Sequence, residues 1–253
     1  MARDPLPPRI QALRRRDAYP GKDGKVELIQ THISWVFLVG DDVYKVKKPV
    51  DLGFANFTTL ARRKAACEAE VRLNRRGCPG GVYLGVETLN RQGDTFRVGG
   101  KGEVVDYVVH MKRLPLDGMM DKRLERGEVG FDDIGRVAAR LTALHAEAER
   151  SDRITSLGGT RALETNWREN LDQISPFVGR TLGRARFDRI AAYATGFMAA
   201  ETALLKSRED EGWIRDCHGD LRSDSVVFDD NLPGGICIYD CIEFNDRFRY
   251  VDT

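Results

Sequence analysis

Two short apolar segments near the C-terminus constrain this chain most, because each of them borders an aspartate. Asp220 follows His218 and Gly219 and precedes the apolar run 226–228, whereas Asp240 ends the apolar run 236–239. Either aspartate alone is typical of a turn. A hairpin between the two would bring both carboxylates to one mouth of the fold, and the ordered pair therefore favours a shared site.

A pair of carboxylates placed in this way suits phosphoryl transfer, which needs little covalent chemistry from the protein. One carboxylate receives the proton of the attacking hydroxyl, and another holds Mg²⁺ on the nucleotide phosphates. We assign the first role to Asp220 and the second to Asp240. His218 is either a general base or a histidine that hydrogen-bonds the loop. The structural role is favoured, because the adjacent aspartate already offers an acceptor.

The composition is that of an ordinary soluble protein, with 42% apolar and 31% charged residues in a chain of 253. A net charge of +1 gives no basic excess that would indicate nucleic acid or a membrane surface as a partner. The N-terminal segment lacks the apolar stretch of a secretory signal, and no run is long enough to span a bilayer. We therefore expect a cytoplasmic protein of one large domain or two lobes.

The five cysteines are Cys67, Cys78, Cys217, Cys237 and Cys241, and no two of them form a Cys-x-x-Cys pair. Two of them flank Asp240, which allows a metal or redox pair. The simpler interpretation is that all five are small apolar residues of a reduced core, and we favour it.

The first half of the chain has the patterns of strands and of one helix. We predict strands over 33–39, 43–47, 82–86, 95–98 and 104–111, and a helix from Thr58 or Thr59 to about Arg76. Later helices are expected around 132–145, 164–173 and 182–206. The plan is α+β. Its predicted parts are an N-terminal arm (1–26), either a short helix or a loose segment, an N-lobe (27–111) and a C-lobe (112–253).

Lys45 and Lys47 stand at alternate positions of a predicted strand and therefore share one face. They either face solvent at a strand edge or bind phosphate with help from a glutamate. Glu68 and Glu70 on the following helix are two residues apart, so only one of them can face the sheet. The spacing does not decide which.

Three phrases resemble the aminoglycoside-phosphotransferase family of kinase-like enzymes, most closely a bacterial branch of it: 44–50 (YKVKKPV), 70–76 (EVRLNRR) and 240–250 (DCIEFNDRFRY). The resemblance runs from about Glu27 to the last residue. It implies a protein-kinase-like two-lobe fold with an N-lobe of antiparallel sheet plus one helix. It also implies ATP or another NTP, Mg²⁺, and transfer of the γ-phosphoryl group to a hydroxyl of a small molecule.

Carried over by position, the resemblance assigns further site residues. Lys47 best matches the lysine that binds the nucleotide phosphates, with Lys45 second, and Glu70 matches its helix partner. Ser34 ends the segment 31–34 that takes the place of the phosphate-covering loop. The residues 111–114, with Met111 and Arg113, would form the hinge near the adenine.

The chain departs from the family pattern in two places. Ser225 stands where the family has asparagine as the second metal ligand, and the chain ends at Thr253, where relatives continue. A shortened C-lobe is therefore expected, and some members of the branch carry a C-terminal P-loop ATPase domain, a possible partner. The alternative function is a nucleotide-binding pseudokinase that regulates a partner, and a purely structural protein ranks last. Acidic residues such as Asp132 are scattered, so aminoglycosides are predicted to be poor substrates.

Overall fold

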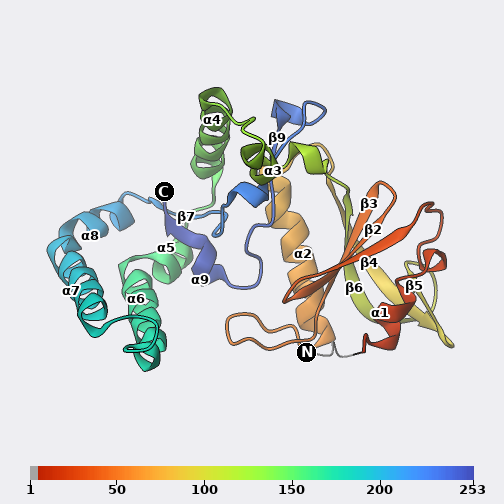
Figure 1. Ribbon diagram of the computed structural model, residues 1–253, viewed down its shortest axis with the longest axis horizontal. Helices are drawn as coiled ribbons and strands as arrows, with labels where there is room; N and C mark the ends of the chain where they lie inside the picture. Colours follow the sequence, from red (N-terminus) through yellow and green to blue (C-terminus); the bar gives the residue numbers. More distant parts are fainter. Residues whose placement is uncertain (1–4) are drawn as a thin grey trace. The chain divides into compact units, whose positions relative to one another are not determined.

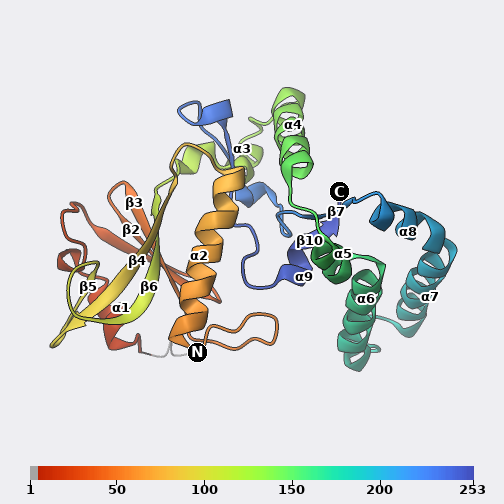
Figure 2. The same cartoon turned by 180° about the vertical axis from the view of Figure 1, so that it is seen from behind.

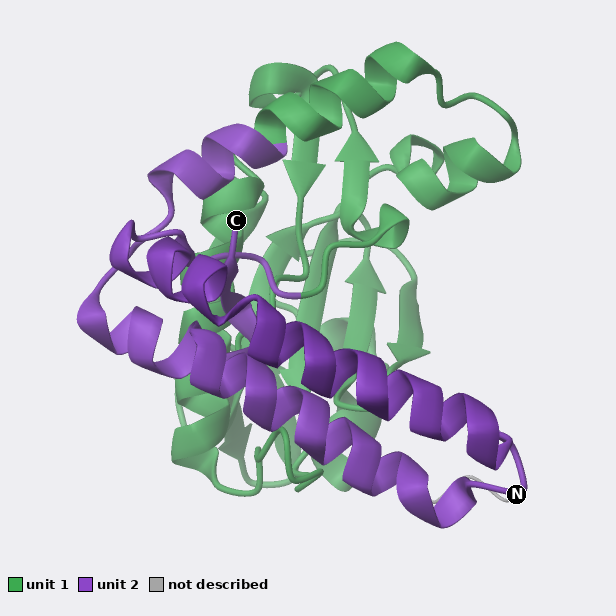
Figure 3. Ribbon diagram, turned by 90° about the vertical axis from the view of Figure 1, so that its left-hand side faces the viewer, with its two compact units in different colours: residues 1–140, 220–245 green, residues 141–219, 246–253 purple. Residues whose placement is uncertain are grey.

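The computed structural model describes residues 5–253 and divides into two compact units (Figure 1; Figure 3). The first unit takes the chain up to Arg140 together with Asp220–Asn245, and the second takes Leu141–Gly219 and Asp246–Thr253. The two segments that carry Asp220 and Asp240 therefore both belong to the first unit. The predicted lobe limits at 27–111 and 112–253 stay a prediction.

A six-stranded antiparallel sheet forms the centre of the first unit. Its strand order is β1-β2-β3-β6-β4-β5. The strands are β1 (Val26–Gln30), β2 (Ser34–Val39), β3 (Asp42–Lys47), β4 (Tyr83–Gln92), β5 (Thr95–Val98) and β6 (Glu103–Lys112). The five predicted strands are confirmed within a few residues as β2 to β6, except that β4 extends six residues beyond the prediction. Strand β1 was not predicted from the sequence.

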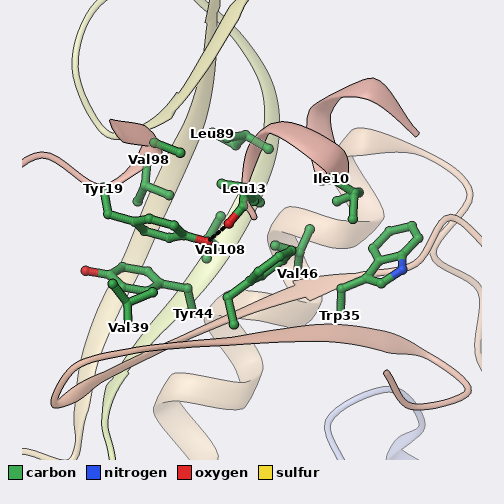
Figure 4. Close-up of a cluster of buried hydrophobic side chains, with 12 residues drawn as sticks. Ile10, Leu13, Tyr19, Trp35, Val39, Tyr44, Val46, Leu89, Val98 and Val108 are labelled. Atoms are coloured by element: carbon green, nitrogen blue, oxygen red, sulfur yellow. Dashed lines mark hydrogen bonds between the residues drawn. The ribbon is translucent and has the colours of Figure 1, made fainter. Parts of the chain in front are cut away.

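One face of the sheet packs against the N-terminal segment, which forms the short helix α1 (Pro8–Ala12) and the 3₁₀ turn η1 (Arg16–Ala18). Ile10 and Leu13 are fully buried there against aromatic side chains of β2 and β3 (Figure 4). The hydroxyl of Tyr19 donates to the carbonyl of Leu13 at 2.7 Å. The segment 6–19 thus contributes Ile10, Leu13, Ala18 and Tyr19 to the core. The sequence had left open whether this segment is a short helix or a loose arm.

A buried carboxylate on β6 ties this segment to the rest of the unit. Asp106 has no exposed side-chain surface, and it is ion-paired with Arg9 at 3.1 Å and with Arg63 at 2.7 Å. Arg63 also donates to the carbonyls of Phe57 and Thr58. A buried charge is tolerated only when it is paired and hydrogen-bonded, and two guanidinium groups meet that need here.

The long helix α2 (Leu60–Gly77) covers the opposite face of the sheet, where it packs on β4 and β6 (Figure 2). It begins as predicted, because the side chain of Thr59 accepts a hydrogen bond from the amide of Arg62. The packing decides between the two glutamates. Glu70 is buried, whereas Glu68 is exposed and pairs with Lys64.

The predicted hairpin between the two aspartates is present. It consists of β8 (Val226–Phe228) and β9 (Ile236–Ile238), paired antiparallel. Cys237 on β9 forms a disulfide with Cys78, which caps the end of α2. The expectation of a fully reduced core is therefore wrong for these two cysteines. Their separation of 159 residues hides the pairing from any local pattern.

The second unit is largely helical. It contains α5 (Asp152–Gly158), α6 (Thr160–Ile174), α7 (Arg184–Ala200), α8 (Thr202–Asp210), α9 (Asp246–Arg249) and the strands β7 (Ile214–Asp216) and β10 (Tyr250–Asp252). Helix α3 (Met120–Glu125) belongs to the first unit, and α4 (Phe131–Glu147) is divided between the two units after Arg140. An antiparallel sheet with a helix, followed by a largely helical region, confirms the α+β class. The single helix expected over 182–206 is instead two helices, which meet at Glu201.

Candidate active site

Five charged side chains of the first unit form a linear ion-pair network that alternates in sign, from Asp240 at one end to Glu243 at the other. Lys45 contacts Glu70 at 2.8 Å and Asp240 at 3.0 Å. Lys47 contacts the other carboxylate oxygen of Glu70 at 2.5 Å and is also ion-paired with Glu243. Both lysines come from β3, both outer carboxylates come from the loop after β9, and Glu70 comes from α2. These ion pairs therefore join one strand, one helix and one loop.

The network has a buried half and an exposed half. The side chains of Lys47, Glu70 and Glu243 are almost completely buried, whereas that of Lys45 is slightly exposed and that of Asp240 is 54% exposed. The exposed half is the half that can meet a ligand. The buried half has no room for one, so its charges must satisfy one another.

The ion pairs of the network shift the pKa values of Lys45 and Glu70. Burial acts to lower the pKa of Lys45, but the carboxylates of Glu70 and Asp240 outweigh it and raise that pKa well above the ordinary value. Burial acts to raise the pKa of Glu70, but Lys45 and Lys47 outweigh it and lower that pKa. Lys45 and Glu70 are therefore both charged at neutral pH.

A cavity of about 300 Å³ lies beside the exposed half of the network and is lined by Lys45, Glu70 and Asp240. Met111 and Arg113 line it too, as does Thr31, whereas Ser34 and Lys47 do not. The remaining walls come from Lys112, Tyr83 and Tyr239 and from the apolar side chains of Ile29, Val36, Leu38, Val43, Val82, Leu114, Leu116 and Met119. An apolar cavity with a few charged groups is the usual form of a small-molecule site.

Asp240 has a special backbone conformation. Between residues 5 and 253 it is the one non-glycine residue with a positive φ, 63°. The following amide, that of Cys241, donates to the side chain of Asn74 at 2.9 Å, and the buried phenol of Tyr83 hydrogen-bonds the Asp240 backbone. Such a conformation persists where the surroundings fix it, and it occurs often at functional sites.

Asp220 is connected to this site through a short chain of contacts. Arg222 lies 3.9 Å from Asp220 and makes a bidentate pair with Asp224 at 2.9 and 3.0 Å. The carbonyl of Asp224 accepts a hydrogen bond from the hydroxyl of Tyr239, next to Asp240. The β8–β9 hairpin thus links the segments of both aspartates, whereas a shared position of the two carboxylates stays a prediction.

The carboxylates of Asp220 and Asp240 suit a hard cation that is held mainly by the phosphates of a bound substrate. Within residues 5–253 no three side chains of His, Cys, Asp or Glu form a ready metal cluster. Asp220 and Asp240 are each about half exposed. This fits Mg²⁺, which keeps several waters and is bound by one or two carboxylates plus substrate phosphates. Ser225, the other predicted metal ligand, is buried, and its carbonyl accepts from the amide of Tyr239.

Five predicted site residues do not line the cavity: Asp220, His218, Ser225, Ser34 and Lys47. Ser34 is fully buried opposite Lys47 in the β2–β3 pair, and Lys47 belongs to the buried half of the network. His218 belongs to the second unit. Glu243, three residues after Asp240, was not predicted from the sequence as part of the site, and neither were Asn74 and Tyr83.

The chain is homologous to mycobacterial proteins. No protein-family model matches it. Over 240 residues, 93% of the chain, it is 32% identical to the uncharacterized protein Rv2004c of Mycobacterium tuberculosis (strain H37Rv) and to the uncharacterized protein Mb2027c of Mycobacterium bovis. The match covers 45% of each relative, so the chain spans about half their length. Among the described helices none is both long and apolar enough for a membrane span.

Proposed function

We propose that this chain is a Mg-ATP-dependent phosphotransferase with a protein-kinase-like fold, acting on a hydroxyl of a small molecule. The observation that carries the proposal is the pairing of Lys45 with Glu70 and Asp240 at the wall of an apolar cavity. A cation and a carboxylate beside an apolar cavity match what a nucleoside triphosphate presents: a flat base, a polyanionic chain and its bound Mg²⁺.

Each residue has a role in this proposal. The apolar walls and the segment with Met111 and Arg113 hold the base, and Lys45 contacts the phosphates. Asp240 holds Mg²⁺, which neutralises phosphate charge when it is bound. Asp220 accepts the proton of the acceptor hydroxyl. The acceptor oxygen then forms a bond to the γ-phosphorus while the bond from that phosphorus to the β–γ bridging oxygen breaks, and ADP leaves.

The proposal assigns the phosphate contact to Lys45, although the resemblance ranked Lys47 first. Lys47 is fully buried, is paired with two glutamates and does not line the cavity. A phosphate could reach it only after the buried pairs had broken, which is costly. Lys45 offers the same charge at the cavity wall.

The alternative is a nucleotide-binding regulatory module without catalysis, and buried Ser225 is the observation that favours it. If no second metal ligand replaces the family's asparagine, binding can persist while transfer fails. The acceptor is not identified by any group of the site, and aminoglycosides stay predicted poor substrates. A C-terminal ATPase domain or a partner chain stays a possible partner, and a cytoplasmic location stays an expectation.

Isothermal titration calorimetry with ATP, with and without Mg²⁺, is the first test. Binding that Mg²⁺ strengthens supports both versions, and the absence of binding contradicts both. A metabolite screen for phosphate acceptors then separates them. Asp220→Ala should reduce any transfer by roughly 10²–10⁴-fold, and Asp188→Ala, at an exposed position of α7, should leave it unchanged. Transfer that survives Asp220→Ala excludes the proposed base.

A further inference from the structure

We infer that Lys47 and Glu243 are positioning residues, which hold Asp240 and release Lys45 for the nucleotide. This inference rests on the proposed function. Neither residue lines the cavity, so they act through the residues that do. The inference is supported by the buried half of the network, in which Lys47 joins Glu70 to Glu243.

The first part of the inference concerns how Glu70 shares its charge. One carboxylate oxygen of Glu70 faces Lys45 and the other faces Lys47. If Lys47 were apolar, Lys45 would be the one counterion of the buried Glu70 in the network. Any movement of Lys45 toward phosphate would then leave the buried charge of Glu70 unpaired. With Lys47 present, Glu70 keeps a counterion throughout. Lys45 can then share its charge between Glu70 and a phosphate.

The second part concerns the loop after β9. Before Asp240, the amide of Tyr239 donates to the carbonyl of Ser225 at 2.9 Å. After Asp240, the amide of Cys241 donates to Asn74, and Glu243 is anchored on Lys47. The loop is therefore held on both sides of a residue with a left-handed backbone. The Lys47–Glu243 pair is the ionic anchor among these contacts.

The charge count gives Lys47 a further effect. The network contains two lysines and three carboxylates, a net charge of −1 when all are ionised. Asp240 is its exposed end, where this excess suits one divalent cation that arrives with a nucleotide. Without Lys47 the net charge would be −2, and the phosphates would meet a more negative wall.

The test compares the affinity for ATP with and without Mg²⁺ in wild-type protein and in Glu243→Gln. The isosteric amide keeps the volume but loses the ionic anchor. We expect the gain in affinity from Mg²⁺ to fall by about tenfold, the lower end of what outer residues contribute at metal sites, with Mg-free ATP binding within about twofold. Glu68→Gln, which removes the exposed charge of the Lys64–Glu68 pair on α2, is the matched control and should change neither.

A second variant, Lys47→Met combined with Glu243→Gln, removes both buried charges of the anchor and should show the same reduced effect of Mg²⁺. Circular dichroism verifies that each variant is folded. If folded Glu243→Gln retains the wild-type gain from Mg²⁺, the inference is wrong while the proposed function stands. If the wild-type protein does not bind ATP at all, the proposed function fails and the inference fails with it.

Discussion

The ammonium group of Lys45 lies 3.0 Å from a carboxylate oxygen of Asp240, a residue 195 positions later in the chain. This contact joins the central part of the sheet to the loop after β9, and both residues line the same cavity. A ligand that presents phosphate and a divalent cation can replace the contact by pairing with each member separately. The pair is thus both an element of the fold and the proposed point of ligand entry.

Lys45→Met should weaken ATP binding on the order of tenfold or more, because a charge-assisted contact to phosphate beside Asp240 is lost. Titration calorimetry measures the change. Lys64→Met, which removes an exposed lysine of α2, is the control and should bind ATP like the wild-type protein. Equal affinities for all three proteins would remove Lys45 from the site.

Much of the fold could be predicted because its signals are local. The Gly40-Asp41-Asp42 turn, the Thr59 cap and the apolar spacing of α2 each lie within a few residues of the element they define. Strand β1 was not predicted because three of its five residues are exposed, and its sequence therefore shows no clear apolar face. It is fixed by pairing with β2. The break at Glu201 has no Gly or Pro to mark it.

The candidate site could be predicted only in part, for a similar reason. The alternation rule puts Lys45 and Lys47 on one face, but it cannot say which of them the rest of the chain covers. Glu243 covers Lys47 from a loop 196 positions away. That contact depends on tertiary packing, which brings the loop after β9 against β3. The motif residues could be predicted from the sequence, whereas the buried half of the network could not.

The ionisation of Glu70 predicts how stability depends on acid. Its pKa in the folded protein lies below the ordinary 4.5, because Lys45 and Lys47 outweigh the effect of burial. Ionised Glu70 therefore stabilises the fold above pH 4.5, and this contribution is lost as the pH falls through the lowered value. The difference in unfolding free energy between wild type and Glu70→Gln should be constant from pH 6 to 8.

Denaturant titrations at several pH values measure that difference. It should narrow only in the acid range below 4.5, and Glu68→Gln should show no comparable effect. A difference that grows as the pH falls from about 7 to 5.5 would mean that the pKa of Glu70 is raised rather than lowered. The two lysines would then not be its effective partners.

The Cys78–Cys237 disulfide predicts a thiol count. Cys67, Cys217 and Cys241 carry thiols outside the disulfide, so thiol titration of the denatured, unreduced protein should find three groups per chain, and five after reduction. Five groups before reduction would contradict the disulfide. Because the bridge closes a long loop between α2 and β9, its reduction should lower the free energy of unfolding by about 2–4 kcal/mol. The Cys78→Ala/Cys237→Ala variant should then be insensitive to reductant.

Asp106→Asn should be among the most destabilising conservative changes in the chain. The amide has the volume of the carboxylate but no charge, and it leaves Arg63 buried without its ionic partner while releasing Arg9 of the N-terminal segment. Breaking a buried pair by removing one charge costs about 3–5 kcal/mol, and denaturant unfolding should show a loss of that order. Asp17→Asn is the matched control, since Asp17 pairs with Arg15 at an exposed position and should shift stability by less than about 1 kcal/mol. Hydrogen exchange locates the effect: amides of 8–19 should lose protection in Asp106→Asn, because the Arg9 contact holds that segment on the sheet. Unchanged protection there would show that apolar packing of Ile10 and Leu13 suffices to hold the segment.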